Sequence, residues 1–139
     1  MYSKQAISKK LRLSAERAWS ALRALDRLDV WFPIIASCRV SGHGVGAWRY
    51  MITIDGGEIQ DVIEVCDDQC RRLVYRRPVS PFPVSQYRGT VEVFTSYDGS
   101  AVVVWTIDFE SEVGVANEVA ALVEQAISAG IDGMELDLL

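Results

Sequence analysis

The pattern of apolar residues changes once along the chain, at Gly114, and this change constrains the fold more than any other feature. From about residue 35 to residue 110, short runs rich in β-branched and aromatic residues alternate with turns rich in glycine, proline and aspartate. Such alternation is typical of antiparallel strands joined by short turns. After Gly114, apolar residues recur at helical spacing in a stripe that includes Val119, Leu122 and Ile127. This order predicts a sheet of consecutive hairpins followed by one long helix.

The turn signals also set the expected elements. Strands are predicted at residues 35–41, 47–54, 58–66, 70–77, 85–96 and 100–110, after a first strand near 5–13. Ser14 is a favourable helix N-cap, so a helix is expected from there to about Leu25. A short second helix over 27–31 should end at Pro33, because the residue before a proline is pushed out of the α region.

Seven antiparallel strands and a long C-terminal helix make an α+β fold, and 139 residues suit one domain spanning 1–139. One helix does not fill the concave side of a strongly bent sheet, so the interior holds either large side chains or a cavity. Gly130 and Gly133 each cost a helix about 1 kcal/mol relative to alanine, which indicates close packing or space for another group. We therefore expect a largely apolar internal pocket.

Composition excludes several other classes of protein. The net charge of −5 disfavours binding to phosphate backbones, so no nucleic-acid partner is expected. No apolar run approaches the ~18 residues of a membrane span, and the N-terminus lacks the apolar core of a signal peptide, which predicts a cytoplasmic protein without membrane insertion. Three cysteines without Cys-x-x-Cys spacing and one histidine predict no metal site, and no cofactor is expected.

The hairpin over residues 48–65 holds the most informative charged residue. Asp61 alternates with apolar Ile59 and Ile63, so it should face the interior. A symmetric register about the Asp55-Gly56-Gly57 turn pairs Met51 with Asp61, Thr53 with Ile59 and Arg49 with Ile63. An isolated buried carboxylate is costly, so Asp61 is expected to form an ion pair with Arg49, to contact a ligand, or to reach water at the rim.

The first strand of this hairpin contradicts that assignment. Its even positions, Trp48, Tyr50, Ile52 and Ile54, are more apolar than its odd positions and would face inward by alternation alone. A β-bulge would reconcile the two strands. Alternatively, a partner chain covers the even face, which makes a homodimer a second expectation.

Scattered motifs along nearly the whole chain resemble one superfamily. They are Ser14-Ala-Glu-Arg-Ala-Trp19, Trp31-Phe-Pro33, Gly42-His-Gly-Val-Gly46 with Arg49, Asp55-Gly56, Tyr75, Pro83-Val84 before Tyr87, and Trp105. Together they resemble the START/polyketide-cyclase-like superfamily, also called SRPBCC or the birch-pollen-allergen fold. The resemblance implies a helix-grip fold: a seven-stranded sheet that surrounds a C-terminal helix and a hydrophobic cavity.

A narrower resemblance is to bacterial relatives of the plant abscisic-acid receptors. Ile35-Ala-Ser-Cys38 and Glu64-Val-Cys-Asp-Asp68 are similar to that branch. The resemblance places its gate loop at Asp55 to Glu58 and its latch at Phe82-Pro83-Val84. The chain departs from the receptors in having Ala36 where they place a carboxylate-binding lysine, and its gate sequence differs.

The candidate ligand-binding residues come partly from alternation and partly from the resemblance. They are Trp31, Phe32, Arg49, Met51, Thr53, Ile59, Asp61, Phe82, Val84, Tyr87, Leu122, Ala126 and Gly130. Among these, Arg49, Asp61 and Tyr87 would orient the polar end of a ligand.

Three functions follow as hypotheses. The leading one is binding of a small hydrophobic molecule, such as a lipid, polyketide or isoprenoid, for transport or sensing. The second is a polyketide cyclase, aromatase or dehydratase in which Asp61 is the acid/base and Tyr87 or Arg49 polarises a carbonyl. The third is a protein-interaction domain that uses the apolar even face of strand 47–54.

Overall fold

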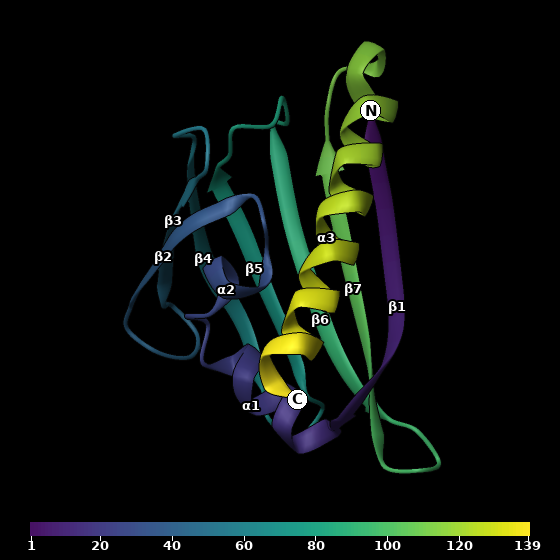
Figure 1. The fold of residues 1–139 in the computed structure, drawn as a ribbon. Coiled ribbons are helices and arrows are strands. Elements are labelled where there is room, and N and C mark those ends of the chain that lie inside the picture. Colours follow the sequence, from purple (N-terminus) through teal and green to yellow (C-terminus); the bar gives the residue numbers. More distant parts are fainter.

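A computed structural model describes all 139 residues, and it confirms the predicted α+β helix-grip architecture. Seven antiparallel strands form one curved sheet in the order β1-β7-β6-β5-β4-β3-β2, and the long helix α3 crosses its concave side (Figure 1). The strands are β1 (Tyr2–Ser14), β2 (Ile35–Ser41), β3 (Trp48–Thr53), β4 (Glu58–Asp67), β5 (Arg72–Val79), β6 (Gln86–Thr95) and β7 (Ser100–Glu110). All seven lie close to their predicted ranges.

The helices are α1 (Ala15–Arg23), α2 (Leu28–Trp31) and α3 (Ala116–Leu138), with a 3₁₀ turn over Val113–Val115. Ser14 caps α1 as predicted, because its hydroxyl accepts a hydrogen bond from the Arg17 amide at 3.2 Å. The helix ends two residues before Leu25, which has a left-handed backbone with a φ of 71°. No helix is both long and apolar enough to cross a membrane.

The hydrophobic core lies between α3 and the inward faces of the strands. In β7, residues at odd positions from Ala101 to Phe109 are buried, as strand alternation requires. The buried stripe of α3 is Val119, Val123, Ile127, Ile131, Met134 and Leu138. Leu122 was expected in this stripe, but it is 44% exposed because it lies one residue away from the buried face.

Two glycines let α2 pack directly against α3. A Cβ atom at Gly133 would lie 2.1 Å from the carbonyl oxygen of Trp31, and one at Gly130 would lie 2.3 Å from the ring of Phe32. Side chains at these positions would therefore separate the two helices. Of the two roles that the sequence suggested for these glycines, close packing is the one the structure shows.

The predicted register of the β3–β4 hairpin is wrong by two residues. Arg49 pairs with Asp61 and Met51 with Ile59, because the turn is centred on Asp55 and not on Gly56. The Thr53 amide donates to the Gly57 carbonyl at 2.8 Å. A shift of two residues leaves each side chain on the same face of the sheet, so the assignment of the odd positions to the interior is confirmed.

The even face of β3 points away from the core without any bulge in its pairing with β4. Ile52 is 40% exposed, and Trp48 and Tyr50 stack on each other with ring centroids 6.2 Å apart. The bulge considered for this hairpin is therefore absent. A partner chain over this face stays a prediction.

Candidate functional site

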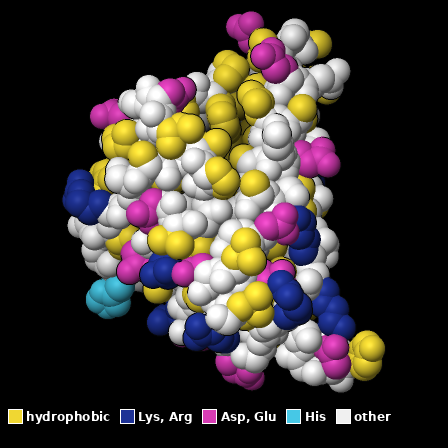
Figure 2. Space-filling view, viewed as in Figure 1, with side chains coloured by type: hydrophobic (Ala, Val, Ile, Leu, Met, Phe, Trp, Pro, Cys, Tyr) yellow, Lys and Arg dark blue, Asp and Glu magenta, His cyan; other side chains and the backbone are white.

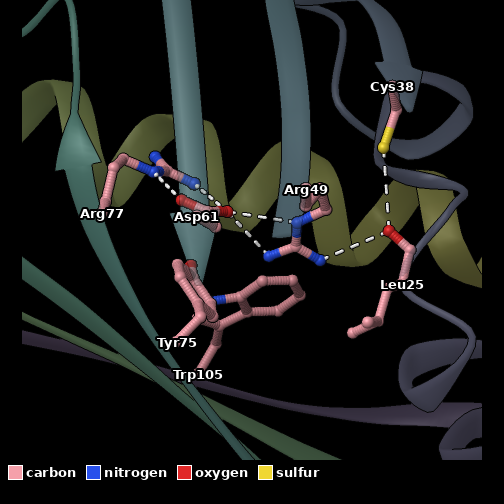
Figure 3. Close-up of polar contacts among 7 residues, drawn as sticks. All are labelled: Leu25, Cys38, Arg49, Asp61, Tyr75, Arg77 and Trp105. Carbon is pink, nitrogen blue, oxygen red and sulfur yellow. Dashed lines mark hydrogen bonds and ion pairs between the residues drawn. The ribbon is translucent and has the colours of Figure 1, made fainter. Parts of the chain in front are cut away.

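A buried cluster of three charges lies on adjacent strands at the concave side of the sheet (Figure 3). Asp61 on β4 accepts hydrogen bonds from Arg49 on β3, whose Nη2 and Nε lie 2.9 and 3.1 Å from Oδ2. Arg77 on β5 donates from Nε to Oδ1 at 2.7 Å and from Nη2 to Oδ2 at 3.2 Å. The predicted Arg49–Asp61 pair is confirmed, and Arg77 makes it a triad.

Strand geometry explains how the three side chains meet. Arg49 is directly opposite Asp61 in the β3–β4 ladder. On the other side, Gln60 pairs with Val79 and Val62 pairs with Arg76, so two residues of β5, Arg77 and Pro78, face Asp61 alone. Such a bulge suits Pro78, which has no amide hydrogen to donate to the ladder.

Asp61 stays ionised despite complete burial. Burial by itself would raise the pKa of its carboxyl group, but the charges and hydrogen bonds of Arg77 and Arg49 outweigh it and hold the pKa below the ordinary value. Both carboxylate oxygens accept hydrogen bonds from guanidinium groups. The geometry therefore argues against Asp61 as a general base, since a base needs a free oxygen and a pKa near the working pH.

Two tyrosines cover the triad on its cavity side. The Arg77 guanidinium carbon lies 4.6 Å from the ring centroid of Tyr87 and 5.4 Å from that of Tyr75. The Tyr75 hydroxyl accepts a hydrogen bond from the indole nitrogen of Trp105 at 3.1 Å. Burial raises the pKa of both tyrosines, so both hydroxyls are neutral donors at physiological pH.

The cavity next to this cluster has a volume of about 30 Å³. It is lined by Leu28, Phe32, Ile34, Ile35, Met51, Thr53, Ile59, Tyr75, Arg77, Pro81, Phe82, Tyr87, Ala126 and Ile127. This volume holds about two water molecules. The wall is largely apolar, as expected. The free volume, however, is far smaller than that of the predicted pocket for a whole ligand.

Aromatic side chains account for the small volume. The ring of Phe32 lies against Gly130 and meets Trp105 edge to face, with centroids 5.4 Å apart. The ring of Tyr75 lies on Gly89, where an added Cβ would be only 2.1 Å away. Each ring fills space that is free because the facing residue is a glycine without a side chain.

The structure brings about half of the candidate ligand-binding residues to the cavity wall. These are Phe32, Met51, Thr53, Ile59, Phe82, Tyr87 and Ala126. Arg49 and Asp61 lie in the neighbouring triad and not on the wall.

The other four candidates lie elsewhere. Trp31 is buried between helices, where its indole nitrogen donates to Asp137 at 2.9 Å. Val84 lines a separate surface groove with Glu110. Leu122 is exposed on α3, and Gly130 is covered by the ring of Phe32. Their contact with a ligand stays a prediction.

Arg77 is the residue of the candidate site that the sequence reasoning missed. It follows Leu73 and Tyr75 at alternate positions of β5, so strand alternation places it on the inward face. As part of a local cluster of arginines, however, it was assigned to a solvated face. The alternation of residues 73, 75 and 77 was the signal that could have identified it.

Hydrophobic side chains gather between the N-terminal half of α3 and the loops that join β3 to β4 and β5 to β6 (Figure 2). Ile54 in the first loop is 71% exposed, and Leu122 on α3 is 44% exposed. Pro81 and Phe82 of the second loop form part of the cavity wall. An apolar molecule would meet the cavity from this side.

No group of three or more His, Cys, Asp or Glu side chains is placed to hold a metal ion.

Acid should destabilise the fold through its buried and bridged carboxylates. Hydrogen bonds from Arg27 and Trp31 lower the pKa of Asp137, and the two arginines lower that of Asp61. A carboxyl group whose pKa is lower in the folded than in the unfolded state stabilises the fold at pH values above its unfolded pKa, about 3.9. This contribution is lost as the pH falls through the pKa of the folded state. We expect the free energy of unfolding in urea to be constant between about pH 7 and 5 and to fall below about pH 4. Constant stability down to pH 3 would contradict these assignments.

A curved antiparallel sheet that surrounds a C-terminal helix and an apolar cavity defines the helix-grip class of ligand-binding domains. Within it, the chain belongs to the Polyketide cyclase / dehydrase and lipid transport family, whose model matches residues 6–138. The resemblance to the START/polyketide-cyclase-like superfamily is thereby confirmed. The narrower one to relatives of the abscisic-acid receptors stays a prediction.

Several solved structures share the fold. An uncharacterised protein from Bacillus thuringiensis is 25% identical over 98% of both chains, with a TM-score of 0.86. A protein from Thermobifida fusca is 25% identical over 95% of this chain and 90% of its own, with a TM-score of 0.83. Norcoclaurine synthase from Thalictrum flavum, solved with a transition-state analogue, is 15% identical over 99% of this chain and 94% of its own, with a TM-score of 0.81. No curated protein matches the chain significantly.

Proposed function

We propose that this protein binds a small apolar or amphipathic molecule between α3 and the sheet. The observation that carries the proposal is the cavity wall, which is apolar except for Thr53, Arg77 and two tyrosines. Binding sites for small molecules combine such a wall with a few polar groups. Burying about 200 Å² of apolar ligand surface would contribute about 5 kcal/mol, enough for measurable affinity before the costs of opening.

The loop between β5 and β6 is the element that must move to admit a ligand. The tip of the loop makes only local backbone hydrogen bonds, from the Phe82 amide to the Ser80 hydroxyl at 3.2 Å and from the Val84 amide to the Phe82 carbonyl at 2.8 Å. Its last residue, Ser85, is held to β7 by its amide, which donates to the Glu110 carbonyl at 2.9 Å. Phe82 is half-buried, whereas Phe32 is wedged between Gly130 and Trp105. An outward movement of Phe82 would enlarge the cavity without disturbing the helix contacts.

The direct test is native mass spectrometry of the purified protein, followed by denaturing extraction of any bound molecule. In parallel, the neutral probe N-phenyl-1-naphthylamine should gain fluorescence when it is mixed with the protein. The absence of both a co-purified molecule and a fluorescence gain would contradict the proposal.

Replacing Phe82 with alanine should accelerate entry of the same probe. The variant removes part of the wall at a loop position, so we expect a stability loss of only about 1 kcal/mol. The rate of fluorescence increase should rise several-fold in a stopped-flow experiment, since opening of the loop limits entry. Phe94→Ala is the matched control, because Phe94 is 49% exposed on β6 and lies outside the cavity wall. Equal rates in both variants would show that the ligand enters elsewhere.

Binding is better supported than catalysis because the only buried carboxylate at the site is held by two arginines. The interaction-domain hypothesis rests on the outer face of β3, where Trp48 and Tyr50 are half-buried and stacked and Arg39 lies over Tyr50. Contacts among these three side chains already cover much of their apolar surface, which weakens the case for a missing partner.

A further inference from the structure

Two hydrogen-bond donors at the cavity have no partner in the protein. Arg77 donates from Nε and Nη2 to Asp61, which leaves Nη1 without an acceptor, and the Tyr87 hydroxyl makes no hydrogen bond. The side chain of Arg77 is 8% exposed and Tyr87 is 4% exposed. No fully buried side-chain nitrogen or oxygen lacks a partner, so both donors reach open space.

Both donors belong to residues that line the internal cavity. Tyr87 faces the concave side of the sheet with Gly89 and Val91 on β6. Arg77 lies on the same face of β5 as buried Leu73 and Tyr75, next to Asp61. Arg77 and Tyr87 also line a groove of about 400 Å³ over β5, β6 and β7, together with exposed Arg76, Gln86 and Arg88 and with Asp108 and Glu110.

The charge around the cavity is not balanced. Arg49 and Arg77 carry two positive charges and Asp61 carries one negative charge, which leaves one positive charge in a buried cluster. None of the fourteen residues that line the cavity is acidic. An uncompensated buried charge is costly, and an anion beside Arg77 would neutralise it.

We propose that the ligand carries a carboxylate, which binds Arg77 Nη1 and the Tyr87 hydroxyl while its apolar part lies along Phe32, Met51 and Ile127. This inference rests on the proposed ligand-binding function and adds the chemical class of the ligand. The ring of Tyr87 lies against the guanidinium group, so one carboxylate can accept from both donors. Asp61 holds Arg77 in place and has no contact with the ligand.

The test compares octanoate with 1-octanol, which differ in their polar end and have the same number of carbon atoms. Calorimetry near neutral pH should show that octanoate binds about tenfold more tightly, because a charge-assisted hydrogen bond replaces a neutral one. Arg77→Met leaves Arg49 and Asp61 as a neutral pair, and it should remove the preference for octanoate. Arg39→Met, on the outer face, is the matched control and should keep the preference.

Tyr87→Phe keeps the inference testable even if Arg77→Met fails to fold. It removes a hydroxyl that has no partner, so the fold should keep its stability, while octanoate affinity falls several-fold and octanol affinity is unchanged. Tyr97→Phe is its control, since Tyr97 is 98% exposed.

The outcomes separate the two proposals. Binding of neither octanoate, octanol nor N-phenyl-1-naphthylamine would overturn ligand binding itself. Equal binding of octanoate and octanol, or a preference that survives both Arg77→Met and Tyr87→Phe, would overturn the carboxylate site and leave ligand binding intact.

Discussion

Replacing Asp61 with alanine should lower the free energy of unfolding by about 3–5 kcal/mol, the cost of breaking a buried ion pair by removing one partner. The loss is at the upper end of this range because one carboxylate serves two arginines. Arg49 would keep only a long contact from Nη1 to the Leu25 carbonyl at 3.5 Å, and Arg77 would keep no acceptor. Urea unfolding followed by circular dichroism measures the change.

Asp132→Ala is the control for the loss of an aspartate ion pair. Asp132 binds Lys9 at 2.8 Å, but its side chain is 63% exposed, so we expect a loss below about 1 kcal/mol. The double variant Asp61→Ala with Arg77→Met should be more stable than Asp61→Ala alone, because it removes one of the two uncompensated charges. If Asp61→Ala were as stable as Asp132→Ala, the triad would not hold the three strands together.

The fold was predictable because the turns and the helix carry local signals. Ser14 caps α1 through its own side chain, and the residues after Gly114 repeat at helical spacing. Even the inward orientation of Asp61 followed from its apolar neighbours on β4. Alternation is insensitive to a shift of two residues, however, so it gave the correct face with the wrong cross-strand partners.

The site was only partly predictable because it depends on contacts between distant elements. That Arg49 and Arg77 meet at one carboxylate appears only when β3, β4 and β5 are aligned. The volume of the cavity depends on Phe32 meeting Gly130 and Tyr75 meeting Gly89, pairs that lie far apart in the sequence or on different strands. The sequence pattern of one strand or helix shows neither which residues pair across strands nor how far an aromatic ring fills the interior.

The contact between α2 and α3 also leads to a prediction in which two effects oppose each other. Alanine in place of Gly133 should stabilise α3 by about 1 kcal/mol through helix propensity alone. Its Cβ, however, would lie 2.1 Å from the Trp31 carbonyl oxygen, and a backbone atom cannot rotate away as a side chain can. Moving α2 would also strain the bond from the Trp31 indole to Asp137 at 2.9 Å. Steric overlap therefore outweighs propensity.

We expect Gly133→Ala to lose about 1–3 kcal/mol of unfolding free energy, the usual cost of overpacking. Gly114→Ala is the control, because nothing lies within 4 Å of the added methyl group and its stability should not fall. The displaced α2 is followed in the chain by Phe32, so N-phenyl-1-naphthylamine should also bind Gly133→Ala differently from the wild type. A Gly133→Ala protein more stable than the wild type would mean that α2 moves at little cost in free energy. Phe32 would then be, like Phe82, a part of the cavity wall that can move.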